Sequence, residues 1–380
     1  MPDNSRRADA VLSWTPLLAG VLNSYGPIAF NYGFALYFLD YRHGFVKRGL
    51  IGELFSSLGF MSRGTLVAIE YIFLGVAFAL TYLVFRPVLF GSSSERRLAA
   101  ALLSAPALLP HLGYLFAQPD VVLYILLLGC FTVFVRARPA VAAIVSCLLS
   151  CVALLAHEAF CLMFYPLILA MLLYLCARRR LAWLVGAAHL LIVGAVFVAV
   201  IHWGTLKISP DALLLEAQAH TNVGIQRQLY DVMASNLQQQ WALVHRMYTP
   251  GVIRILVLTL FLTAPYLILL ARLLRGTMRA AGLGSLQQNS TAVLFVSPLL
   301  LCALGHDTTR WIGAMCIDAT FFLLYLYLTE PPGSAVRKVL QDWANGTSFV
   351  PWLAYLLAVG PYGATGLRAA DQIVSALYGP

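Results

Sequence analysis

Charged and polar side chains gather in four short segments of this chain, separated by long apolar runs. In the first segment, Asp40 is followed within eight residues by Arg42, His43, Lys47 and Arg48. The other three segments are Gln118-Pro119-Asp120, His157-Glu158 and His306-Asp307-Thr308-Thr309-Arg310. A carboxylate can take a proton from a hydroxyl, and clustered cations can bind and neutralise a phosphate. These residue types suit the transfer of a group from a phosphate carrier to a hydroxyl.

Each of these segments, taken alone, is also typical of a solvated turn between two helices. His157-Glu158 departs from that pattern, because apolar residues flank it on both sides and a carboxylate near hydrocarbon needs a partner. Two further acids, Glu70 and Asp318, fall inside apolar runs. An ionisable group there is a functional candidate unless a structural partner holds it.

The composition indicates which elements must position these residues. The chain has 380 residues, of which 61% are hydrophobic and 11% charged, and its mean hydropathy is +0.81. A soluble domain carries roughly a quarter charged residues, and disordered or coiled-coil chains carry many more polar ones. The apolar runs are continuous, so they predict helices and not the alternating strands of a barrel. We therefore expect an all-α, polytopic membrane protein.

About 20 apolar residues span a bilayer, and this rule predicts about eleven transmembrane helices. They are expected near 12–39, 66–89, 98–117, 120–136, 140–157, 159–177, 181–203, 251–272, 289–305, 311–329 and 347–362, with a kink in the first at Gly26-Pro27. With the N-terminus in the cytoplasm, the inner side carries fifteen Lys and Arg against five acids, and the outer side nine against nine. The positive-inside rule therefore predicts an N-in, C-out topology.

On this topology the chain forms a single transmembrane domain over residues 1–380 with more chain outside than inside. Residues 1–11 are the cytoplasmic N-terminus, 40–65 the first outer loop, 204–250 a large outer loop and 363–380 a short outer tail. Within the first loop, residues 44–60 have apolar side chains at helical spacing, which predicts a helix lying on the membrane surface. The seven cysteines fall in apolar runs and are interpreted as packing residues. No nucleotide-binding motif is present, and nothing points to nucleic acid.

The layout resembles the GT-C superfamily of integral-membrane glycosyltransferases. Its members have a functional acid directly after the first helix, a membrane-parallel helix in the first outer loop, and often a second acid after the third helix. Asp40, the stretch 44–60 and Asp120 match these features. The resemblance covers roughly residues 1–180, and the large C-terminal domain usual in the superfamily has no counterpart here.

The resemblance implies an inverting displacement on a polyprenyl-phosphate sugar, with a glycan, lipid or protein as acceptor. Asp40 is then expected to be the catalytic base. The expected ligands of the donor phosphate are Arg42, His43, Lys47, Arg48 and Arg310. Residues expected to hold the sugar or support Asp40 are Asp120, His157, Glu158, His306 and Asp307. The resemblance identifies no definite cofactor and leaves a divalent metal open, and the site is expected to face the periplasm from the inner membrane.

Two other functions stay open at this stage. An O-antigen-type glycan polymerase or ligase uses arginines in large outer loops, and Arg227 and Arg246 are the candidates here. A proton-coupled transporter would use intramembrane groups such as Asp318, Glu70, Arg254 and His189. Transporters of this kind usually show internal repeats, and none is visible in the sequence.

Overall fold

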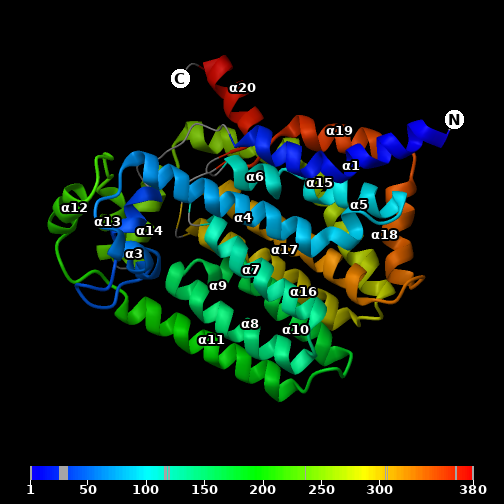
Figure 1. Ribbon diagram of the computed structural model, residues 1–380, viewed down its shortest axis with the longest axis horizontal. Coiled ribbons are helices and arrows are strands. Elements are labelled where there is room, and N and C mark those ends of the chain that lie inside the picture. The colour runs from blue at the N-terminus through cyan, green and yellow to red at the C-terminus, as the bar shows by residue number, and fades with distance from the viewer. Residues whose placement is uncertain are drawn as a thin grey trace.

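The computed structural model describes residues 2–24, 33–114, 118, 120–235, 237–303, 305, 307–363 and 366–378. Within these ranges the regular elements are helices, joined by short loops, and the only strand-like contacts are two isolated bridges. Most of the long helices run side by side, and α3, α12, α13 and α14 gather at one end of the bundle, on the left of Figure 1. We call this the α3 end, and the opposite end the basic end.

Six helical segments are long and apolar enough to cross a membrane. They are α4 (Arg63–Leu89), α8 (Pro139–Ala156), α11 (Trp183–Trp203), α15 (Pro250–Ala280), α16 with η3 (Ser285–Ala303) and α17 (Thr308–Thr329). In α17, 83% of the most apolar window is buried within the protein, against 17% in α11 and in α15. Because buried apolar surface faces protein and exposed apolar surface suits lipid, α17 is the central helix and α11 and α15 are peripheral. The fold indicates a helical membrane protein, while eleven spans and the N-in orientation stay predictions.

The expected helix 98–117 is wrong as a single element, because the structure has α5 (Ser93–Leu103) and α6 (Leu109–Tyr114) with a break between them. Pro106 lies in this break, where a residue without a backbone N–H cannot continue a helix. The N-terminus of α5 is fixed by a capping box in which Ser92 and Glu95 bond each other's backbone N–H. The next helix, α7 (Asp120–Arg136), has the predicted bounds.

Several other expected helices differ from the prediction in their bounds, and α15 extends to Ala280, eight residues beyond the predicted end at 272. The stretch 159–177 divides into α9 (Phe160–Met163) and α10 (Tyr165–Ala177), since Pro166 starts a new helix. α19 (Phe349–Val359) ends three residues earlier than expected, at Gly360, whose φ is 74°. α1 (Pro2–Asn23) begins earlier than expected, η1 (Phe34–Phe38) follows it, and the predicted kink at 26–27 lies outside the described residues.

The predicted membrane-surface helix over 44–60 is also shorter than expected. It consists of α3 (Gly49–Phe55) and the 3₁₀ turn η2 (Ser56–Leu58), since Gly44 and Arg48 have positive φ and interrupt any earlier helix. Its expected apolar face is divided: Val46 and Ile51 are buried, whereas Leu54 is 68% exposed and Leu58 53%. The exposed pair is available to lipid, while the buried pair packs into the bundle.

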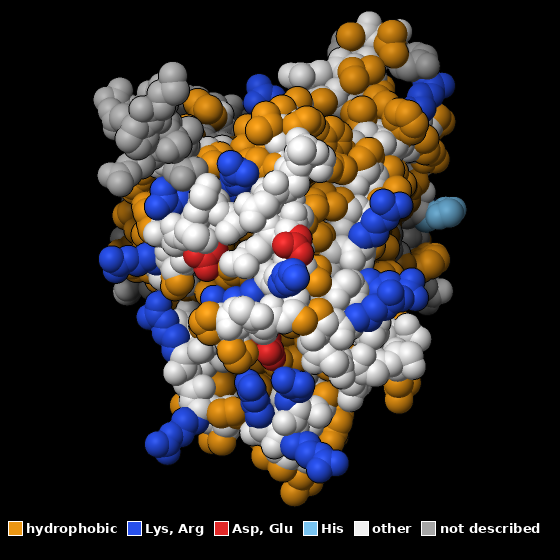
Figure 2. All heavy atoms as spheres, turned by 90° about the vertical axis from the view of Figure 1, so that its right-hand side faces the viewer, with side chains coloured by type: hydrophobic (Ala, Val, Ile, Leu, Met, Phe, Trp, Pro, Cys, Tyr) orange, Lys and Arg blue, Asp and Glu red, His pale blue; other side chains and the backbone are white. Residues whose placement is uncertain are grey.

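The remaining helices are α12 (Pro210–Ala219), α13 (Gln228–Ala234), α14 (Leu237–Met247), α18 (Ala335–Asn345) and α20 (Arg368–Tyr378). The first three lie in the loop predicted over 204–250, and α20 lies in the predicted tail. Figure 2 shows the basic end, where Lys and Arg side chains are spread over the surface and Asp and Glu are few.

Candidate acid–base site at the α3 end

Arg310 links two helices through a buried ion pair with Asp120. Its Nε and Nη2 atoms each donate to one carboxylate oxygen of Asp120 at 2.5 Å, and Nη1 donates to Asp307 Oδ2 at 2.9 Å. The side chains of Arg310 and Asp120 are only 5% and 3% exposed. Asp120 is the first residue of α7, and Arg310 lies in the first turn of α17. The guanidinium also lies 4.8 Å from the ring centroid of Trp311.

A second buried ion pair connects the first loop with the turn between α8 and α9. Arg48 Nε donates to the two carboxylate oxygens of Glu158 at 3.0 and 2.8 Å, and Nη2 also donates to Glu158. The two side chains are 12% and 14% exposed. Arg48 has φ 64°, a left-handed conformation that is costly for a residue with a Cβ. Such strain is found at functional sites, where the surroundings fix the residue.

His157 brings these two ion pairs into one electrostatic cluster. Burial and the charges of Arg48, Arg310 and Lys47 lower the pKa of His157 well below its usual value, against the opposite effect of Glu158. Its Nδ1 accepts a hydrogen bond from the backbone N–H of Ala159 at 3.1 Å. A neutral imidazole with an accepting Nδ1 carries its proton on Nε2. His157 is therefore a neutral Nε2–H donor set among cations.

Lys47 is the third cation of this cluster. Its backbone N–H donates to the carbonyl of Gly204 at 2.8 Å, and the residue is 8% exposed. Burial lowers the pKa of Lys47, the field of Glu158 raises it and the field of Arg48 lowers it further. Burial also opposes ionisation of Glu158, yet Arg48 and the neighbouring charges outweigh it and hold the pKa of Glu158 below its usual range. In this cluster, the pKa of each group therefore depends on the charges of its neighbours.

Asp40 lies in a different group of contacts. Arg42 donates to its carboxylate from Nε at 2.7 Å and from the backbone N–H at 3.0 Å. The Asp40 side chain is 5% exposed and that of Arg42 is 53% exposed. His43 Nε2 lies 2.9 Å from Glu216 Oε2 on α12. These contacts fix the orientation of the Asp40 carboxylate and join the first loop to α12.

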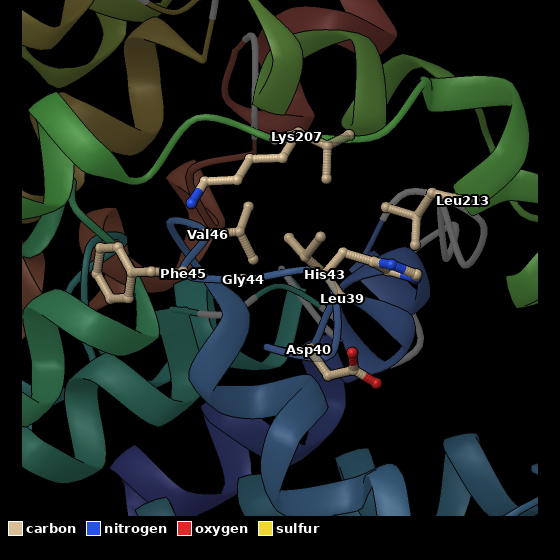
Figure 3. A pocket seen from close by; sticks show the side chains of 9 residues that line it. Leu39, Asp40, His43, Gly44, Phe45, Val46, Lys207 and Leu213 are labelled. Atoms are coloured by element: carbon tan, nitrogen blue, oxygen red, sulfur yellow. The ribbon is translucent and has the colours of Figure 1, made fainter.

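A small pocket lies between the first loop and the segment that follows α11 (Figure 3). It is lined by Leu39, Asp40, His43, Gly44, Phe45, Val46, Leu206, Lys207 and Leu213. Gly44 has φ 99°, and a Cβ there would lie 3.2 Å from Lys207 Nζ, so glycine allows the close approach of this cation. Figure 3 shows the Asp40 carboxylate pointing away from the Lys207 amine.

The structure brings together part of the predicted site. Asp120, Asp307, Glu158 and their arginines form the cluster around His157, whereas the contacts of Asp40 are with Arg42. His306, another predicted site residue, lies outside the described residues. Lys207 and Glu216 were not predicted, because single charges in a long loop gave no signal of proximity.

The last two observations concern metal ligands and similarity to known proteins. Across the described ranges, no group of three or more His, Cys, Asp and Glu side chains is placed to hold a metal ion. Comparisons of the chain with protein-family models, curated proteins and solved structures find no match. Fold and site together define a helical membrane protein with a buried acid–base cluster near the end that carries α3.

Proposed function

We propose that this chain is an integral-membrane glycosyltransferase similar to the GT-C superfamily. It would move a sugar from a polyprenyl-phosphate donor to a glycan, lipid or protein acceptor at the extracytoplasmic face of the plasma membrane. The observation that carries the proposal is the buried array of three cations and three acids around His157, beside the short helix α3. Preorganised charge of this kind stabilises a departing phosphate.

Among the cations, Lys47 is the best candidate for the donor phosphate. Arg48 and Arg310 are each engaged by a carboxylate through two or more hydrogen bonds, so their charge is largely compensated. In the part of the chain that the structure describes, Lys47 has no ion pair, although Glu158 lies within its electrostatic reach. A buried cation without a direct anionic partner favours an anionic ligand. Arg48 and Arg310 would position the site.

Asp40 is the candidate base, because Arg42 orients its carboxylate at the wall of the pocket next to the first loop. In this reaction Asp40 would accept the proton of the acceptor hydroxyl while the phosphate leaves with the electrons of the broken bond. Exposed Leu54 and Leu58 would border the polyprenyl tail.

The test is transfer from a defined polyprenyl-phosphate sugar by purified protein in lipid vesicles. Asp40→Asn should lower the rate by about 10²–10⁴-fold, the usual contribution of a general base, without lowering the melting temperature. Asp211→Asn is the matched control, because Asp211 is an acid at the same end whose side chain is 65% exposed. Wild-type transfer by Asp40→Asn would show that Asp40 is not the base.

A proton-coupled transporter is the second candidate, and Asp318 is the observation that favours it. This acid on central helix α17 is fully buried, and neither carboxylate oxygen has a hydrogen-bond partner among the described residues. His189, another of the intramembrane candidates, contacts Ser146 and Tyr165. Proton movement into vesicles that disappears with Asp318→Asn, while glycosyl transfer is absent throughout, would favour this function.

The contacts of the candidate arginines give less support to the polymerase or ligase alternative. Arg227, one of its two candidate arginines, lies 3.3 Å from Asp211 and 3.3 Å from Asp231, with a side chain that is 53% exposed. An exposed arginine between two exposed acids is a weak surface contact and not a preorganised anion site. We therefore retain the glycosyltransferase as the main proposal.

A further inference from the structure

The basic end has an unusual turn where α10 ends. The Arg180 N–H donates to the carbonyl of Leu175 at 2.9 Å, and the Arg179 N–H to that of Cys176 at 3.0 Å. This pair of bonds is a Schellman motif, which places the residue after the helix in a left-handed conformation. That residue is Arg179, with φ 55°. Glycine is the usual residue there, so an arginine costs stability that a glycine would not.

The end of α15 provides an internal comparison. It closes with the same two bonds, from Gly282 to Arg279 at 2.9 Å and from Leu283 to Met278 at 3.1 Å, and here the left-handed residue is a glycine. The two turns are neighbours, since a Cβ built on Gly282 would lie 3.8 Å from Arg178 Nη1. The same motif therefore has the favoured residue in one turn and an unfavoured cation in the other.

Arg178, Arg179 and Arg180, which we call the arginine turn, are all exposed. Arg178 lies 3.6 Å from Glu330, a buried acid that also accepts a hydrogen bond from Tyr174. For the described part of the chain, Arg179 and Arg180 form no ion pair. Cations at a helix C-terminus are favourable in general, but that effect does not require an arginine at the strained position. The left-handed arginine points to a role beyond helix capping.

The position of the turn suggests what it binds. α11 starts three residues later with Trp183, which is 60% exposed, and Leu184, which is 80% exposed. α11 is one of the six candidate membrane-spanning helices, so this exposed apolar start marks the level where hydrocarbon begins. The arginine turn then lies at the level of lipid head groups, on the face that Figure 2 shows to be rich in Lys and Arg.

We propose that the arginine turn binds the phosphate of an anionic phospholipid. Guanidinium groups bind phosphate oxygens in bidentate fashion, and basic side chains next to membrane helices attract anionic head groups. The nearby C-termini of α10 and α15 carry partial negative charge, so binding of an anion there depends on the arginines. The proposal is independent of the reaction at the α3 end.

The experiment measures the melting temperature of the full chain in neutral detergent during titration with phosphatidylglycerol or phosphatidylcholine. Wild type should be stabilised by phosphatidylglycerol and not by phosphatidylcholine. Arg179→Gly should weaken the apparent affinity for phosphatidylglycerol about fivefold, and Arg179→Gly with Arg180→Gln about 25-fold, at roughly one fivefold step for each basic residue. Glycine is the residue that this turn favours, so Arg179→Gly should melt no lower than wild type in detergent alone.

Two controls separate this site from general charge effects. Arg246→Gln removes one exposed arginine from α14, at the α3 end, and should leave the phosphatidylglycerol response unchanged. Inorganic phosphate at the same concentration should stabilise the protein far less than the lipid. An unchanged lipid response in the double variant, an equal loss in Arg246→Gln, or equal stabilisation by inorganic phosphate would each overturn the proposal.

Discussion

Arg310 shows how an ion pair changes the role expected of a residue. Its type and its neighbours predicted a phosphate ligand, but sequence spacing does not reveal which carboxylate a buried cation will meet. The partner, Asp120, lies 190 positions away in the chain. Because both side chains are buried, loss of the arginine would leave an uncompensated carboxylate. Stability, and not donor use alone, should therefore respond to substitution.

We expect Arg310→Leu to lower the free energy of unfolding by about 3–5 kcal/mol. This is the usual cost of removing one partner of a buried ion pair, because the remaining partner stays buried without a counter-charge. Arg310→Leu combined with Asp120→Leu should recover much of that loss, because no unpaired charge is left in the pair. Denaturant unfolding in detergent measures both variants. Equal stability of the single variant and wild type would mean that water already compensates Asp120.

His157 predicts how stability depends on pH. Its pKa in the folded protein lies well below its usual value, mainly through burial, so below about pH 6.5 the unfolded chain binds a proton that the folded protein does not. Stability should then fall as the pH drops, by up to about 1.4 kcal/mol per pH unit. His157→Asn, which keeps an acceptor for the Ala159 N–H, should flatten this slope. His245→Asn, an exposed residue on α14, should not.

At the scale of elements, continuous apolar runs were predicted well and interrupted ones were not. α7, α8 and α11 match the predicted spans within two residues at each end, because nothing inside them competes with helix formation. Breaks at Pro106 and before Pro166 divided two expected spans. A hydropathy average over about 20 residues is insensitive to one proline, whereas that proline can end a helix.

Gly52 in α3 offers a test in which packing and helix propensity disagree. Alanine favours a helix over glycine by about 1 kcal/mol, but a Cβ on Gly52 would lie 2.2 Å from the carbonyl oxygen of Leu39. Gly52→Ala should therefore push α3 away from Leu39 and Asp40, lowering both the melting temperature and transfer. In α4, a Cβ on Gly75 meets nothing within 4 Å, so Gly75→Ala should raise stability by about 1 kcal/mol. Thermal unfolding with parallel transfer assays measures both, and a stabilised Gly52→Ala would contradict the packing argument.

The end shown in Figure 2 carries many exposed Lys and Arg side chains, and the mixed acid–base cluster lies near the α3 end. The sequence predicts a charge asymmetry between the two sides of the membrane, because that asymmetry depends only on the order of the loops and not on side-chain partners. It could not predict that Asp40 and the cluster around His157 form separate contact groups, since that depends on how the first loop packs against the segment after α11.

The positive-inside rule predicts an orientation for the molecule, and this prediction can be tested directly. If the basic end faces the cytoplasm, the variant Lys207→Cys, with its new thiol beside the pocket, should react with a membrane-impermeant maleimide added to intact cells or spheroplasts. The variant Arg180→Cys, at the basic end, should react only in inverted vesicles, because the positive-inside rule predicts that this turn lies in the cytoplasm. Both sites are exposed, and the parent protein with its native cysteines gives the background, since those are buried or partly buried. The reverse labelling pattern would place the acid–base cluster toward the cytoplasm, where a polyprenyl-phosphate donor could still be met but the proposed extracytoplasmic reaction could not occur.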